Sequence, residues 1–257
     1  MEPTGAGGVA VRGVSKQFES RAGRQTAISG VDLKIAPGQF VSLLGPSGCG
    51  KTSLLRIIGG LMEPSTGTVS VDGGSVADAV RARKFGFVFQ DATLLPWRTV
   101  RANAMLLLDV IGRQGEEDRV DALLETVGLS DFTNHYPAQL SGGMRQRVAL
   151  ARALALDPEI LLMDEPFAAL DAITRERLGV ELLGIWDGAR SVVFVTHSIA
   201  EAVLLSDRVV VMSTSPGRIV ADIGIDIARP RSASVRSSER FKAYEDQLRD
   251  LIEGVRA

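Results

Sequence analysis

Short apolar runs alternate along the chain with longer stretches in which apolar residues recur every three or four positions. Three runs near the N-terminus are rich in Val, Ile and Leu and are separated by glycine and proline: residues 9–15, 27–35 and 39–44. Three later runs contain four consecutive apolar residues each: 159–165, 191–197 and 207–213. Such runs are typical of strands, and the later ones of strands buried in a parallel sheet. Helical spacing separates the later runs, so the alternation predicts an α/β fold.

The pattern changes to helical spacing between residues 100 and 156. Two short predicted strands, 68–73 and 85–90, precede this region, which we interpret as an inserted helical subdomain at about 91–156. From Arg229 the composition is linker-like, and a tail with an apolar stripe follows. We therefore predict a main domain at 1–232 and an amphipathic helical tail at 233–257. The stripe is expected to pack on its own domain rather than bind a partner or a membrane. It consists of Phe241, Tyr244, Leu248, Leu251, Ile252 and Val255.

Composition narrows the classes of function. The chain has 257 residues, 45% of them hydrophobic, which is enough to bury a sizeable core. It carries 29 basic and 31 acidic residues, so it lacks the positive charge of a nucleic-acid binder and we expect no nucleic-acid partner. The apolar runs are too short to cross a bilayer, and any membrane role is expected to be peripheral. The polar start MEPTGAGG and the single cysteine, Cys49, favour the cytoplasm.

A glycine-rich segment, GPSGCGKT at residues 45–52, directly follows one predicted strand. Its spacing fits a phosphate-binding loop whose backbone N–H groups converge on an anion, with Lys51 adding charge and Thr52 offering a hydroxyl to Mg²⁺. The helix expected to start at Lys51 would also direct its positive end at the phosphates. An ordinary glycine-rich turn is the alternative. The candidate nucleotide-binding residues are Gly45, Pro46, Ser47, Gly48, Cys49, Gly50, Lys51, Thr52 and Ser53.

Two adjacent carboxylates, Asp164 and Glu165, end another predicted strand. Because ligands of open α/β sheets bind at the carboxyl ends of strands, Asp164 could reach the Mg²⁺ held by Thr52. Glu165 could orient and deprotonate an attacking water. The alternative is that both acids cap the following helix.

Polar residues end two further predicted strands in the same way. His197 could contact the γ-phosphate and hold the water in line, although a structural histidine is the alternative. Gln90 could respond to Mg²⁺ and water, but a lone glutamine is a weak signal.

The segment LSGGMRQR, residues 140–147, predicts a second anion site on the same chain. Ser141, Gly142 and Gly143 would open a helix with a hydroxyl and free N–H groups. One phosphate tail seldom needs two such sites. The sequence therefore suggests a head-to-tail dimer in which this segment covers the nucleotide held by Lys51 of a second copy. The alternative is that the segment begins a helix with glycines and binds no ligand.

Taken together, these motifs resemble, in order and spacing, an ATP-binding subunit of an ABC transporter over residues 9–227. The resemblance implies a P-loop NTPase (RecA-like) core with an N-terminal antiparallel β part and an inserted α-helical subdomain. It also implies ATP and Mg²⁺ as ligands and binding of the opposite subunit's ATP by Ser141–Gly143. In that family Gln90 belongs to the loop toward the transmembrane partner, Asp171 to the dimer contact and Phe18 to stacking on adenine. From the residues alone, Phe18 could equally lie in the core.

Residues 90–103 and 163–172 resemble importer ATPases for nitrate, aliphatic sulfonates and taurine, and Trp97 is either a permease contact or a structural aromatic. The resemblance implies a cytoplasmic ATPase, peripheral on the inner face of the membrane. Its expected partners are a second copy, permease subunits and an extracytoplasmic solute-binding protein. A soluble ABC-type ATPase acting on ribosomes or DNA is the main alternative. A small-molecule kinase would leave residues 140–147 unexplained.

Overall fold

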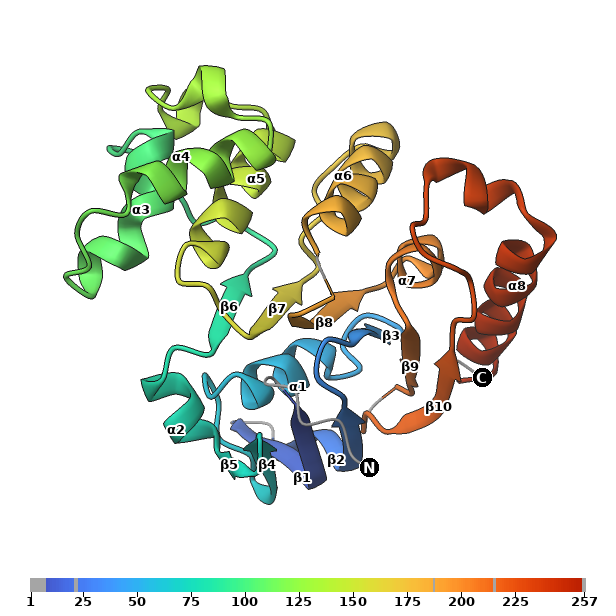
Figure 1. Cartoon of the computed structure of the whole chain (residues 1–257). Coiled ribbons are helices and arrows are strands. Elements are labelled where there is room, and N and C mark those ends of the chain that lie inside the picture. Colours follow the sequence, from blue (N-terminus) through green and yellow to red (C-terminus); the bar gives the residue numbers. More distant parts are fainter. Residues whose placement is uncertain (1–7, 21–22, 187, 215, 256–257) are drawn as a thin grey trace.

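Two β-sheets and the helices around them make up the described part of this computed structural model, residues 8–20, 23–186, 188–214 and 216–255 (Figure 1). The polar start, on which the expected cytoplasmic location partly rests, lies mostly outside these ranges. The strands are β1 (Val9–Ser20), β2 (Gly23–Ile35), β3 (Phe40–Leu44), β4 (Thr66–Val71), β5 (Gly74–Ser75), β6 (Phe85–Val88), β7 (Ile160–Asp164), β8 (Ser191–Thr196), β9 (Arg208–Met212) and β10 (Ile219–Gly224). The helices are α1 (Lys51–Ile58), α2 (Val76–Arg81), α3 (Val100–Val110), α4 (Glu117–Thr126), α5 (Gly142–Leu154), α6 (Ala172–Ile185), α7 (Ile199–Leu205) and α8 (Glu239–Gly254), with 3₁₀ turns at Ser130–Phe132, Pro137–Gln139 and Ala233–Ser237.

The central sheet has the strand order β10-β9-β3-β8-β7-β6, and all its neighbouring strands run parallel except β10 on β9. The inner strands β3, β7 and β8 are buried at every position because both faces of the sheet are covered there. In β3, Phe40 and Leu44 join one hydrophobic cluster, whereas Val41 and Leu43 join the other. This alternation across two buried faces confirms the predicted parallel α/β core.

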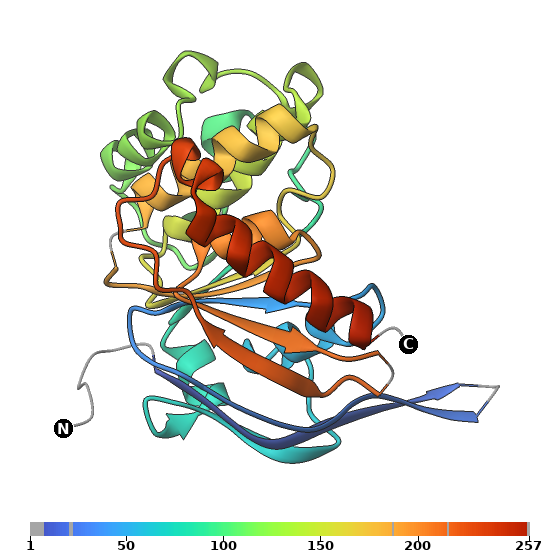
Figure 2. The same cartoon turned by 90° about the vertical axis from the view of Figure 1, so that its right-hand side faces the viewer.

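The second sheet, ordered β2-β1-β4-β5, is antiparallel and packs with α1 on one face of the central sheet. It corresponds to the expected N-terminal antiparallel part. Strands β1 and β2 extend further than the apolar runs predicted, because the exposed residues beyond them continue the pairing to Ser20 opposite Gly23. The two strands therefore form a long hairpin that projects from the body (Figure 2).

The helical insert, α3 to α5, lies at one end of the central sheet (Figure 1). Its apolar positions, including Val100, Leu108, Leu124 and Val148, are fully buried and belong to the same cluster as one face of the sheet. The predicted helical subdomain is thus fused to the core by continuous apolar packing rather than hinged on a polar surface.

The C-terminal helix α8 lies across α7 and the neighbouring strands (Figure 2). Phe241 and Leu248 are at most 1% exposed, which confirms that the stripe packs on its own chain. With 16 residues α8 is the longest described helix, and none in the described ranges is both long and apolar enough to span a membrane.

The linker-like appearance of the segment after Arg229 was misleading. Arg231 is only 5% exposed, and its guanidinium donates hydrogen bonds of 2.8–3.2 Å to five backbone carbonyls. Three of these belong to the C-terminal end of α7, whose last carbonyls have no partner within the helix: Val203, Leu204 and Ser206. Burial lowers the pKa of Arg231 to about 10. A buried cation at this helix end fixes the C-terminal segment to the core.

Replacing Arg231 by methionine should lower the free energy of unfolding by about 2–4 kcal/mol, because several buried carbonyls lose their donor. Urea unfolding measures this loss. Arg249→Met is the control, since Arg249 forms only an exposed ion pair with Asp246, and it should change stability by less than about 0.5 kcal/mol. Equal urea midpoints for the two variants would contradict the anchoring role of Arg231.

Candidate functional site

The loop between β3 and α1 is shaped by two glycines with left-handed backbones. Gly48 has φ +78° and Gly50 has φ +93°, and a Cβ at Gly50 would lie 2.3 Å from Cγ2 of Ile28. No other residue fits there without displacing β2. The chain turns through this loop and enters α1 at Lys51, as the sequence predicted.

Lys51 lies at the centre of the loop and is 4% exposed. Its ammonium donates to the carbonyls of Gly45 at 2.7 Å and Pro46 at 2.8 Å. A buried ammonium beside a helix N-terminus is a strong attractor for anions. The loop therefore has the charge and the backbone curvature of a phosphate site.

An open pocket of about 320 Å³ lies against this loop and contains much of the predicted site. From the loop and α1 it is lined by Ser47, Gly48, Gly50, Lys51, Thr52 and Ser53, and from elsewhere by Phe18, Gln25, Ala27 and Glu165. Gly45, Pro46 and Cys49 are buried and form the inner part of the loop. The polar end and the aromatic end of the pocket match the phosphates and the base of a nucleotide.

Phe18 is not part of the core, because 40% of it is exposed and its ring lines the pocket. The Lys16 ammonium lies 5.4 Å from the ring centroid. Stacking of Phe18 on adenine remains a prediction. Gln25, which the sequence analysis missed, is paired with Phe18 across β1 and β2 and lines the same pocket. Only the hairpin register could have revealed it.

Thr52 and Asp164 join the loop to β7. The Thr52 hydroxyl donates to Asp164 Oδ1 at 2.7 Å, and Asp164 is 7% exposed. Burial raises the pKa of Asp164, while the Thr52 hydrogen bond opposes that rise. The pair fits Mg²⁺, which prefers oxygen ligands and usually takes one or two from protein and the rest from phosphate and water. The described residues contain no group of three or more His, Cys, Asp or Glu side chains that could hold a metal alone.

Glu165 and His197 lie together at the ends of β7 and β8. His197 Nδ1 is 3.0 Å from Glu165 Oε2. Glu165 has a left-handed backbone, φ +43°, and its N–H donates to the Val195 carbonyl at 3.0 Å. This conformation is uncommon for a residue with a side chain and is typical of functional sites. Neither acid caps a helix, since Asp171 caps α6, so that alternative was wrong.

The remaining candidates lie elsewhere on the chain. Gln90 is exposed and lies after β6. Ser141 caps α5, because its hydroxyl accepts a hydrogen bond from the Met144 N–H at 3.3 Å. Gly142 and Gly143 form the first turn of α5. Asp171 accepts from the backbone of Ile173 and Thr174, and hydrogen bonding from Thr174 lowers its pKa. None of these residues lines the loop pocket, so the structure does not bring the two predicted anion sites of one chain together.

A buried carboxylate behind His197 was also missed. Glu201 Oε2 accepts from the Thr196 hydroxyl at 2.6 Å, and that hydroxyl accepts from the Ser198 N–H at 3.0 Å. Glu201 Oε1 lies 3.5 Å from Arg175 Nε, and Arg175 donates to the Leu170 carbonyl at 2.9 Å. These contacts brace the residues on both sides of His197. The Ser-x-x-Glu spacing of 198–201 was the available signal, because it matches a capping box.

Comparison with known proteins identifies a family and close relatives. The family described as ABC transporter matches residues 28–168. An uncharacterised ABC transporter ATP-binding protein of Methanocaldococcus jannaschii is 48% identical, covering 94% of this chain and 90% of its own length. The taurine import ATP-binding protein TauB of Yersinia pestis is 48% identical over 79% of this chain and 80% of its own. The aliphatic sulfonates import ATP-binding protein SsuB of Bacillus cereus is 42% identical over 95% and 96%.

Solved structures agree with these relatives. A dimeric ATP-binding cassette in a post-hydrolysis state, bound to ADP and Pi, superposes with a TM-score of 0.75 at 36% identity. The match covers 86% of this chain and all of that cassette.

The burial of Glu201 predicts a pH dependence of stability. Its side chain is 12% exposed, and burial raises its pKa above the ordinary value of 4.5. The folded state then holds this proton to higher pH than the unfolded state does, so the group's contribution to stability declines as pH rises from about 4.5 through the raised pKa.

Relative to wild type, Glu201→Gln should therefore gain stability as pH rises from 4.5. Urea unfolding between acid and neutral pH measures the difference. Glu176→Gln, which alters the more exposed ion pair with Arg236, is the matched control on α6 and should give a curve parallel to wild type. A parallel curve for Glu201→Gln as well would show that the prediction is wrong.

Proposed function

The chain belongs to the ABC transporter family and is one of its ATP-hydrolysing, nucleotide-binding subunits, and we propose that two copies of it energise solute uptake through a separate membrane permease. One observation carries the dimer. The phosphate loop lines a pocket, whereas the second anion motif at Ser141–Gly143 lies on α5 outside it. A head-to-tail arrangement gives each motif a role, since Ser141 of one copy then covers the nucleotide held by Lys51 of the other. In this arrangement Asp171 lies at the contact between the copies.

Within each pocket the residues divide the chemistry of ATP hydrolysis. Lys51 and the loop N–H groups hold the phosphates, Phe18 stacks on adenine, and Thr52 and Asp164, with Gln90 in the closed state, hold Mg²⁺. When bound, Mg²⁺ neutralises charge on the phosphate oxygens. Glu165 accepts a proton from the water whose oxygen attacks the γ-phosphorus, while the bond to the ADP oxygen breaks. His197, held by Glu165 at 3.0 Å, contacts the γ-phosphate and keeps the water in line.

Nucleotide binding drives closure because the complete site exists only in the closed dimer. Hydrolysis removes the γ-phosphate that both copies contact, so the dimer opens and resets the permease. We propose the boundaries 1–232 for the ATPase domain, with the helical subdomain at 91–156, and 233–257 for the tail.

The relatives favour a small solute of the sulfonate or taurine kind, with nitrate as a further member of the group. We place the subunit in the cytoplasm, on the inner face of the membrane, with a solute-binding protein on the other side. Trp97 is 72% exposed and follows the Gln90 segment, which supports a role in contacting the permease rather than in filling a loop. A soluble ABC-type ATPase is less favoured, because the named relatives are import subunits.

Replacing Glu165 by glutamine should lower the turnover of ATP by about 10²–10⁴-fold, since the general base is lost while its size is kept. Phosphate release measures turnover, and light scattering after gel filtration should show an ATP-dependent dimer. Glu176→Gln, remote from the pocket, should leave both readouts near wild type. Unchanged turnover in Glu165→Gln would exclude Glu165 as the base.

Tagged Glu165→Gln protein, purified from its native membranes with MgATP, should carry a multi-spanning permease identified by mass spectrometry. Trp97→Ala should reduce this recovery without lowering the ATP-dependent dimer, because Trp97 is exposed and outside the pocket. Recovery of ribosomal proteins or nucleic acid instead would favour the hypothesis of a soluble ABC-type ATPase, and the assignment of the nucleotide site would not change.

A further inference from the structure

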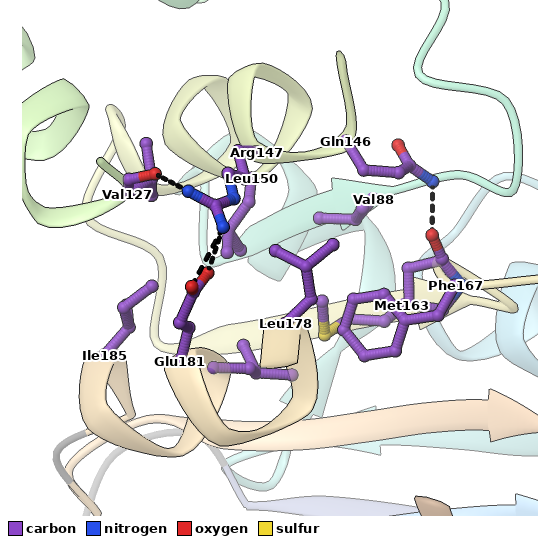
Figure 3. Close-up of a pocket in the computed structure, with 12 residues that line it drawn as sticks. Val88, Val127, Gln146, Arg147, Leu150, Met163, Phe167, Leu178, Glu181 and Ile185 are labelled. Atoms are coloured by element: carbon purple, nitrogen blue, oxygen red, sulfur yellow. Dashed lines mark hydrogen bonds and ion pairs between the residues drawn. The ribbon is translucent and has the colours of Figure 1, made fainter. Parts of the chain in front are cut away.

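Gln146 occupies an unusual place on the helix that begins at the signature segment Ser141–Gly143. It is only 7% exposed. Its amide nitrogen lies 3.0 Å from the Phe89 carbonyl, 2.9 Å from the Gln90 carbonyl and 2.7 Å from the Pro166 carbonyl (Figure 3 shows the last contact). A single side chain of α5 therefore reaches two loops that follow different strands of the central sheet.

The two loops are the ones that carry chemistry. One contains Gln90, whose own carbonyl is an acceptor, and the other begins with Glu165, directly before Pro166. The Gln146 Oε1 atom is buried and accepts no hydrogen bond from the described residues. The side chain is thus held through its nitrogen alone, and its orientation is set by the positions of the loop carbonyls.

The neighbouring residue shows how α5 is otherwise attached. Arg147 lies 2.8 Å from Glu181 of α6 and donates to the Val127 carbonyl at 3.0 Å (Figure 3). Apolar side chains such as Leu150 and Leu178 fill most of the space between α5 and α6 and leave a cavity of only about 20 Å³. The Arg147 hydrogen bonds reach neither chemical loop, although Pro166 lines the same cavity.

A second tie between α5 and the segment after β6 comes from Arg152, whose guanidinium donates to the Ala92 carbonyl at 2.7 Å and to the Thr93 carbonyl at 3.1 Å. Gln146 differs from both arginines because its amide contacts the two chemical loops at once.

We propose that Gln146 is a positioning residue that makes the signature helix, the Gln90 segment and the Glu165 loop move together. The inference rests on the proposed function, in which Ser141–Gly143 bind the nucleotide of the second copy. When α5 shifts to meet that nucleotide, the amide carries the backbone at Gln90 and Pro166 with it. Closure of the dimer and placement of the metal-contacting glutamine and the base then occur as one event. Without the amide, Arg152 still holds the backbone at Ala92 and Thr93. The helix loses its hydrogen bonds to the Gln90 and Pro166 carbonyls, however, and could close on nucleotide while the residues at these two points stay out of place.

The test is Gln146→Met, which keeps the length of the side chain but removes its donors. We expect kcat for ATP hydrolysis to fall by about 10–100-fold, as for small misplacements of catalytic groups, with KM for ATP within about 3-fold of wild type. The Mg²⁺ concentration for half-maximal activity should rise, because the Gln90 carbonyl loses its hydrogen bond from the amide. In the Glu165→Gln background, the ATP-dependent dimer should still form.

Arg147→Met is the matched control. Arg147 is the next residue of the same helix, and its guanidinium, like the Gln146 amide, joins α5 to its surroundings. The substitution should lower the thermal midpoint but leave kcat per folded molecule and the Mg²⁺ requirement near wild type. If Gln146→Met folds poorly, Gln146→Asn carries the test. It keeps the amide but is too short to reach both loops, so it should give the same kcat and Mg²⁺ changes.

A kcat unchanged in the folded Gln146 variants, or an equal loss in Arg147→Met, would overturn the inference. A dimer that no longer forms in the Gln146→Met, Glu165→Gln double variant would also overturn it, because the residue would then act on nucleotide binding. These outcomes differ from failure of the proposed function, in which the Glu165→Gln variant with Gln146 intact would form no ATP-dependent dimer.

Discussion

The hydrogen bond from Thr52 to Asp164, 2.7 Å long, joins residues 112 positions apart and depends on the whole central sheet being built correctly. Strand β3 pairs with β8 in parallel, and β8 pairs with β7, with Leu44 opposite Thr196 and Asp164 opposite Val195. Because the strands are parallel and in this register, their carboxyl ends meet along one edge. The phosphate loop, the carboxylates and His197 thus reach one place without any local sequence contact between them.

A parallel sheet imposes a second constraint, since both its faces must be covered. One face is covered by α1 and the antiparallel sheet, and the other by the insert, α3 to α5, together with α6, α7 and α8. The phosphate loop enters a helix of the first layer, whereas the signature begins a helix of the second. The two anion motifs of a chain are therefore set in different layers, and a second copy supplies the simplest way to join them over one nucleotide.

The sequence predicted what depends on local pattern. The positions of β7 and β8 follow from their apolar runs, and the start of α1 at Lys51 follows from the glycine spacing. It could not place Gln25 beside Phe18, because that neighbourhood comes from the register of a polar hairpin. It also misjudged Arg231, since a segment rich in serine and arginine is expected to be solvated unless its carbonyl partners at the end of α7, 25 to 28 positions away in sequence, are known. Gln146 was hidden for the same reason, as its partners lie 20 to 57 positions away.

Three locally unfavourable features of the fold lie in or beside the loop that follows β7. Glu165 adopts a left-handed backbone, Asp164 is a carboxylate whose burial raises its pKa, and Gln146 keeps one buried amide oxygen without a described donor. Each would be removed by a substitution that favours stability alone, and sequences are expected to break local rules chiefly where function requires it. The strain lies where α5, the Gln90 segment and the base meet. In the proposed mechanism nucleotide supplies partners at this junction, and a ligand that binds one arrangement of the junction better than another shifts the population toward it.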